Sequence, residues 1–221
     1  MKALADTART ILGAVLAIVF VGGCTYRDHP LYPTPPLPME AQGPAGVRIA
    51  QIVESVERLD SLRAQLAAPL SGRRAAADEE TFRAVHRPVE ALARKMARDN
   101  GWVVEQLAEG YRSSAHRPDP EAREILALMA GRPELIGVWL RTTRDSSPGV
   151  RYFRRITVLP ACLACHGPEE ERPWFVFERY PDDRAFGFRV GDLRGAYAVF
   201  MPEPGAPGGG LAGPAMGAKT P

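Results

Sequence analysis

The run from Cys162 to His166 contains the residue types that hold a haem covalently. Its letters are C-L-A-C-H, and C-x-x-C-H is the attachment signature of a c-type haem. Two thiols one short turn apart add to the two haem vinyl groups as thioethers, and the adjacent imidazole becomes the proximal iron ligand. The pattern therefore predicts a single covalent haem c bound by Cys162, Cys165 and His166, with His166 as a metal ligand.

Three other interpretations of the two cysteines are open from the sequence. A redox-active C-x-x-C pair belongs to a β-α-β setting, whereas this pair follows an aromatic, β-rich stretch over 150–159. A structural zinc site needs four ligands, and no other cysteine lies near. A disulfide between Cys162 and Cys165 would close a very short loop and stabilise little. Haem attachment is the interpretation we favour.

Residues 1–23 have the pattern of a lipoprotein signal peptide. Basic residues precede an apolar run over 11–21, which is shorter than the ~20 residues of a membrane-spanning helix. The small residues before Cys24 resemble a bacterial lipobox, in which the cysteine is acylated after cleavage. An ordinary signal or an uncleaved anchor is the alternative. We expect a lipid-anchored domain on the periplasmic side, at the outer rather than the inner membrane, because Thr25 follows the cysteine where an aspartate would resemble the inner-membrane signal.

Composition and charge argue against several classes of function. One cysteine for lipid and two for haem leave no thiol for a disulfide. The net charge of +2 would be offset by two haem propionates, so no basic field predicts nucleic-acid binding. Most arginines are expected to be solvated, with one or two pairing the propionates. Asp182 and Asp183 beside Pro181 are interpreted as turn residues. No nucleophile–base arrangement indicates an enzyme.

The chain divides by composition into a leader, a tether, one domain and a tail. Prolines recur over 26–44, so residues 24–46 are interpreted as a semi-rigid tether. Residues 47–201 have the size and apolar content of one domain. Residues 202–221 are rich in Gly, Pro and Ala, and we interpret them as a disordered tail.

The first half of the domain is expected to be helical. Apolar residues recur at helical spacing over 49–66 and again over 82–96, with a break near 69–72. A third helix is expected to have Asp119 as its N-cap, Pro120 at its first position and Gly131 at its end.

The second half changes to strand periodicity. The stretches 135–144 and 150–159 are β-branched and aromatic, and the turn residues 145–149 between them predict a hairpin. The stretches 174–179 and 196–200 are interpreted as two further strands. Helices first and strands later predict an α+β fold, with the haem motif on a loop leaving an antiparallel sheet.

Three segments together are more specific than the haem motif alone. They are Cys162–Gly167, Tyr180–Phe188 and Gly191–Ala196. The region 152–200 that contains them resembles the Tll-type, PAS-like haem-binding domain, a family of small exported monohaem proteins and sensory domains of membrane kinases. The resemblance implies a PAS-like antiparallel sheet preceded by long helices.

The same resemblance implies a second iron ligand. In the family pattern a cysteine closely followed by proline supplies it, and here His86, two residues before Pro88, occupies that place. His86 falls on the helix face of Phe82 and Val89, which is expected to face the core. The alternative is a core histidine without a ligand role. We expect His86 to bind the iron opposite His166.

Other candidates for the second ligand are less well placed. His116, in the segment S-S-A-H-R-P, is the second candidate. Met96 and Met129 are interpreted as core residues, because methionine usually fills gaps in cores.

These observations predict a membrane-tethered monohaem cytochrome that passes single electrons to a redox partner protein, which the sequence does not identify. Two histidine ligands would leave the iron six-coordinate, which favours electron transfer over chemistry on a substrate. The alternative is a haem-based redox or gas sensor that acts through a partner protein.

Overall fold

The computed structural model describes residues 44–72 and 77–205. The leader, Cys24 and most of the predicted tether and tail lie outside these residues. The first helix begins at Pro44, so residues 44–46, expected in the tether, are helical. The elements are α1 (Pro44–Ala67), η2 (Ala68–Leu70), α2 (Glu79–Asn100), β1 (Val103–Leu107), η3 (Ser114–His116), α3 (Pro120–Gly131), β2 (Gly137–Arg144), β3 (Ser147–Thr157), η4 (Pro160–Cys162), α4 (Leu163–His166), η5 (Glu169–Glu171), α5 (Trp174–Arg179) and β4 (Leu193–Pro202).

The four strands form one antiparallel sheet in the order β1-β4-β3-β2. The predicted hairpin is formed by β2 and β3, but its turn is shorter than expected. Asp145 and Ser146 alone make it, with left-handed φ angles of 50° and 65°. A two-residue turn with two positive φ angles has a twist that matches its strands, so β3 already begins at Ser147.

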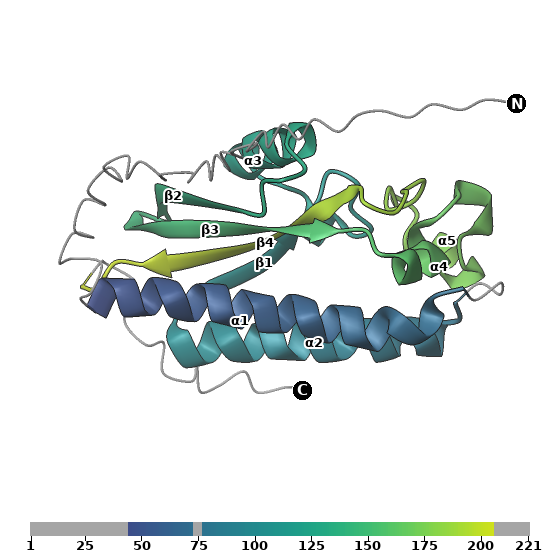
Figure 1. Cartoon of the computed structure of the whole chain (residues 1–221), viewed down its shortest axis with the longest axis horizontal. Coiled ribbons are helices and arrows are strands. Elements are labelled where there is room, and N and C mark those ends of the chain that lie inside the picture. Colours follow the sequence, from purple (N-terminus) through teal and green to yellow (C-terminus); the bar gives the residue numbers. More distant parts are fainter. Residues whose placement is uncertain (1–43, 73–76, 206–221) are drawn as a thin grey trace, which may run out of the picture.

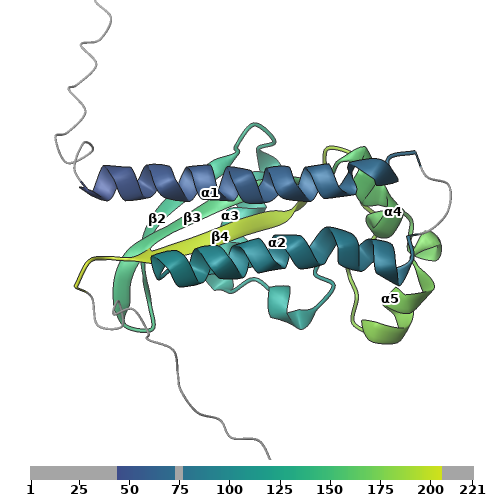
Figure 2. The ribbon, with the colours of Figure 1, turned by 90° about the horizontal axis from the view of Figure 1, so that it is seen from below.

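Alternation along the strands divides the hydrophobic core between the two faces of the sheet. Tyr197 and Val199 of β4 pack with α1 and α2 on one face, whereas Ala196 and Ala198 pack with α3 on the other. Figure 1 shows α1 and α2 below the sheet and α3 above it. Figure 2 shows α1 and α2 side by side across the lower face. The sheet is therefore covered on both faces.

The helix boundaries follow from capping residues. Asp119 accepts a hydrogen bond from the backbone N–H of Ala122 at 2.8 Å, with Pro120 at the first position, so the predicted start of α3 is confirmed. Asp78 caps α2 in the same way, and Gly101 ends that helix with a φ of 65°. The helix continues through Pro88.

The strand predicted over 174–179 is wrong, because these residues form the short helix α5. Trp174 is 74% exposed and Phe177 41%, while Val176 is fully buried. Such burial has no period of two, and β-propensity expresses packing on a sheet that this segment does not join. The sequence does not predict the strand β1, because its residues V-V-E-Q-L do not alternate between apolar and polar. In the structure all but the last of them are half-buried.

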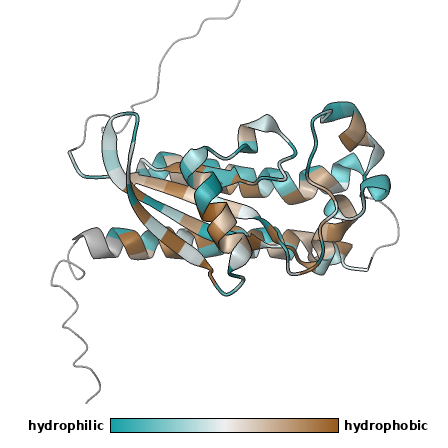
Figure 3. Ribbon diagram, turned by 90° about the horizontal axis from the view of Figure 1, so that it is seen from above, coloured by the Kyte–Doolittle hydropathy of each residue, from teal (hydrophilic) through white to brown (hydrophobic). Residues whose placement is uncertain are grey.

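The α+β class, with long helices before an antiparallel sheet, is confirmed. Hydrophilic and hydrophobic residues alternate along the helices in Figure 3, as amphipathic packing on the sheet requires. Among residues 44–72 and 77–205, no helix is both long and apolar enough to cross a bilayer.

Candidate functional site

The C-x-x-C-H motif lies just beyond the end of β3, at the end of the molecule where α1 stops and α2 starts (Figure 1). It was expected on a loop leaving the sheet, and it occupies two consecutive helical turns there. Cys162 ends η4, and the next four residues form α4, which ends at His166. The Val158 N–H donates to the backbone carbonyl of Asp192, and the Gly191 N–H donates to the backbone carbonyl of Val158. These bonds connect the segment leaving β3 to the turn before β4.

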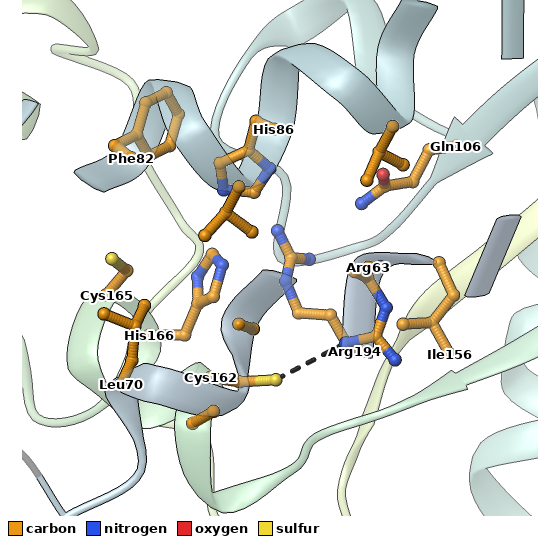
Figure 4. Close-up of a pocket in the computed structure, with 14 residues that line it drawn as sticks. Arg63, Leu70, Phe82, His86, Gln106, Ile156, Cys162, Cys165, His166 and Arg194 are labelled. Carbon is orange, nitrogen blue, oxygen red and sulfur yellow. Dashed lines mark hydrogen bonds between the residues drawn. The ribbon is translucent and has the colours of Figure 1, made fainter. Parts of the chain in front are cut away.

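The two cysteines and His166 line one cavity (Figure 4). Its empty space is about 620 Å³, a volume that includes open solvent at the mouth. The cavity lies between α1, α2 and the motif. Its wall is formed by Arg63, Ala67, Leu70, Phe82, Val85, His86, Val89, Gln106, Ile156, Ala161, Cys162, Cys165, His166 and Arg194.

A second cavity, with about 610 Å³ of empty space including open solvent, adjoins the first, and neither cysteine is part of its wall. The two cavities share six wall residues and form one cleft: Phe82, His86, Val89, Gln106, His166 and Arg194. The second cavity adds a different set of side chains: Glu90, Arg112, Ser113, His116 and Tyr180.

The imidazole of His166 is buried and oriented by one short hydrogen bond. Its Nδ1 lies 2.7 Å from the carbonyl oxygen of Ala185, so Nδ1 carries the proton and Nε2 is free to bind a metal. Burial, with Arg194 and Arg112 adding to it, holds the pKa of His166 well below its usual value. The side chain is therefore neutral, as a metal-binding histidine must be.

His86 projects into the cleft from α2, and His166 projects into it from the opposite wall (Figure 4). The His86 ring packs against the Phe82 ring, with 4.3 Å between their centroids. Burial, followed by the charges of Arg112 and Arg194, lowers the pKa of His86 to about 4. The cleft thus contains two neutral imidazoles on opposite walls.

The other candidate ligands lie elsewhere. His116 lines the second cavity but not the one with the cysteines, and its Nδ1 donates to the carbonyl of Gln106 at 2.8 Å. Met96 and Met129 are buried in the two hydrophobic cores, as predicted.

A buried ion-pair network holds the segments next to His166. Arg112 Nε lies 3.2 Å from Asp183 Oδ1, and Arg112 Nη2 donates to the carbonyl of Cys165 at 2.7 Å. Asp183 also accepts from Arg172 at 3.2 Å and from the backbone N–H of Ala185 at 3.0 Å. The same aspartate therefore fixes the loop whose carbonyl orients His166. Its turn role was predicted, whereas its pairing with two arginines was not.

Two further arginines reach the cleft and had no signal in the sequence. Arg63 of α1 pairs with Asp60 and lies 3.5 Å from the sulfur of Cys162. Arg194 is buried, donates to the carbonyl of Gly110 at 3.0 Å, and has a pKa lowered to about 10 by burial and then by Arg112. Arginines facing a ligand and solvated arginines look alike in a sequence, because only the tertiary structure decides which are buried.

Three observations concern the other interpretations of the two cysteines. Both thiols are free. Burial raises the pKa of Cys165, which disfavours its thiolate. Among the residues that the structure describes, no group of three or more His, Cys, Asp or Glu side chains is arranged to hold a metal such as zinc.

The family model described as Tll0287-like matches residues 44–202. The chain belongs to the Tll0287-like family. Among solved structures, the crystal structure of the cyanobacterial heme-protein Tll0287 shares 42% sequence identity with the chain, with a TM-score of 0.64. The comparison covers 73% of this chain and 97% of Tll0287. No curated protein matches the chain. The resemblance found in the sequence is therefore confirmed over the whole described domain of this Tll0287-like chain.

Proposed function

We propose that the chain binds one haem c covalently and is an electron carrier rather than an enzyme. Cys162 and Cys165 would hold the group by thioether bonds, and Nε2 of His166 would bind its iron. The observation that carries the proposal is the shared cavity of both thiols and a buried, neutral His166, in a chain related to a heme-protein.

His86 would be the second residue that binds the iron. It lines both halves of the cleft, its low pKa keeps the imidazole neutral, and it lies on the wall opposite His166. When bound, the haem supplies a one-electron iron couple whose potential depends on the axial ligands and their burial. The chain's own contribution is to hold both imidazoles neutral and in place, with the Ala185 carbonyl orienting His166.

The protein would work on the periplasmic side of a membrane, anchored by acylated Cys24 and passing electrons to a partner protein. Support for this part comes from the sequence of the leader and the prolines that follow it. The proposal includes no binding of nucleic acid.

Intact-mass analysis tests haem attachment. The full chain, matured in a host with c-type cytochrome assembly machinery, is expected to gain the mass of one haem that survives acid–acetone extraction. The control is the double variant Cys162→Ser/Cys165→Ser, which should carry no covalent haem. A wild-type chain with only its acyl groups would contradict the proposal.

Carbon monoxide separates the carrier from the alternative of a gas or redox sensor. Two histidine ligands leave no open position on the iron, so the reduced protein should keep its spectrum under carbon monoxide. A carbon monoxide adduct that forms readily would favour the sensor.

A further inference from the structure

The walls of the two cavities differ in their chemistry. Cys162 and Cys165 line only the first cavity, whereas Arg112 and Ser113 line only the second. In a haem the vinyl groups and the propionates project from opposite edges of the macrocycle. A haem held by the two thiols in the first cavity would therefore direct its propionates toward the second cavity, whose wall includes Arg112 and Ser113.

Two buried arginines of the second cavity lack part of their partners, because Asp183 pairs with Arg112 but is shared with Arg172. Glu90, which also lines this cavity, pairs with Arg94. Arg112 is 6% exposed, and its Nη1 is buried with no hydrogen-bond partner in the described part of the chain. Arg194 is 9% exposed, and no carboxylate among residues 44–72 and 77–205 lies within salt-bridge distance of it. Buried guanidinium nitrogens without a partner, such as Nη1 of Arg112, are costly, and an anion from outside the chain would relieve that cost.

We propose that Arg112 and Arg194, with Ser113 in the same cavity wall, form a carboxylate-binding site whose ligand is a haem propionate. The site rests on the proposed haem binding. Arg112 would thereby connect the propionate end to the loop that orients His166, since its other nitrogens bond Asp183 and the Cys165 carbonyl.

Porphyrin titration of a chain that cannot form thioethers tests the site. The full chain with Cys162→Ser and Cys165→Ser is titrated with ferric protoporphyrin IX and with its dimethyl ester, and absorbance reports binding. The ester lacks the carboxylates but keeps the iron. The free acid is expected to bind about tenfold more tightly, as one charged hydrogen bond would give.

Arg194→Met is the decisive variant, and Arg155→Met is its matched control. Both arginines are buried and donate Nη1 to a backbone carbonyl, Arg194 to Gly110 at 3.0 Å and Arg155 to Met129 at 2.7 Å. Arg155 is not among the wall residues of either cavity. Arg194→Met should weaken the binding of the free acid only and bring the ratio of acid to ester affinity toward one. Arg194→Lys should keep part of this preference for the acid, and Arg155→Met should leave the ratio unchanged.

Several outcomes would overturn the carboxylate site. One is an equal affinity for acid and ester in the starting chain, which would leave haem binding itself intact. Another is a ratio that Arg194→Met does not change, with circular dichroism showing a folded variant. If the serine chain bound neither porphyrin while the wild-type chain still gained a haem, the thioethers alone would hold the group. Loss of haem from the wild-type chain would instead remove the proposed function.

Discussion

The Nδ1 nitrogen of His166 lies 2.7 Å from the carbonyl oxygen of Ala185, which fixes both the orientation and the tautomer of the motif imidazole. Ala185 lies on a loop held by Asp183, whose carboxylate accepts hydrogen bonds from the Ala185 N–H and from two arginines. The tautomer with a free Nε2 thus follows from the residues packed around the motif, whereas burial keeps the ring neutral.

Replacing His86 by alanine should change the spin state of the bound iron. If His86 binds the iron as proposed, its loss opens a coordination position, so the low-spin spectrum should become high-spin and the reduced protein should bind carbon monoxide. The control is His116→Ala, which should leave the low-spin spectrum intact, because His116 is not in the wall around the cysteines. An unchanged spectrum in His86→Ala would remove it as a ligand.

Replacing Asp183 by alanine should destabilise the fold. Its side chain is fully buried between Arg112 and Arg172, so its loss leaves buried positive charge unpaired, at a cost of about 3–5 kcal/mol. Urea unfolding measures the effect. The exposed neighbour Asp182, changed to alanine, is the control and should alter the free energy of unfolding by less than about 0.5 kcal/mol. Equal effects of the two changes would contradict the network.

Gly195→Ala should also destabilise the protein, because Gly195 has a φ of 153° and a Cβ there would meet the Leu107 carbonyl of β1. The expected loss is about 1–3 kcal/mol, from strain and separation of β1 and β4. Gly131→Ala is the control, since a Cβ at the end of α3 meets nothing within 4 Å. Thermal unfolding compares the two, and a Gly195→Ala protein as stable as the control would count against this packing.

Asp119 should make stability depend on pH. Burial alone would raise its pKa, but hydrogen bonds from Arg151 and the Ala122 N–H outweigh this and lower the pKa below 3.8. A depressed folded-state pKa means that the ionised form stabilises the protein above the unfolded pKa, and that this contribution is lost as the pH falls through the folded value.

The change to test is Asp119→Asn, which keeps a good N-cap and removes the charge. Because the side chain is 45% exposed, the expected loss at pH 7 is only about 0.5 kcal/mol. The difference between variant and wild type should shrink between about pH 5 and pH 2 in urea unfolding. A difference that stays constant over this range would exclude the charge as its cause.

Local chemistry made much of this protein predictable from its sequence. The N-cap and first-turn proline of α3, the apolar stripes of α1 and α2 and the hairpin of β2 and β3 depend on neighbours a few residues away. The motif at 162–166 carries its chemistry in five consecutive letters. Such signals need no knowledge of the rest of the chain.

Tertiary packing decided the remainder. Residues 174–179 have strand-like side chains but no partner strand, so they became a helix, and β1 exists because the edge of β4 was available to pair. Arg112 and Arg194 became buried because contacts distant in sequence enclosed them. Whether an arginine lies in solvent or faces a ligand depends on what the fold brings around it, and that information is distributed over the whole chain.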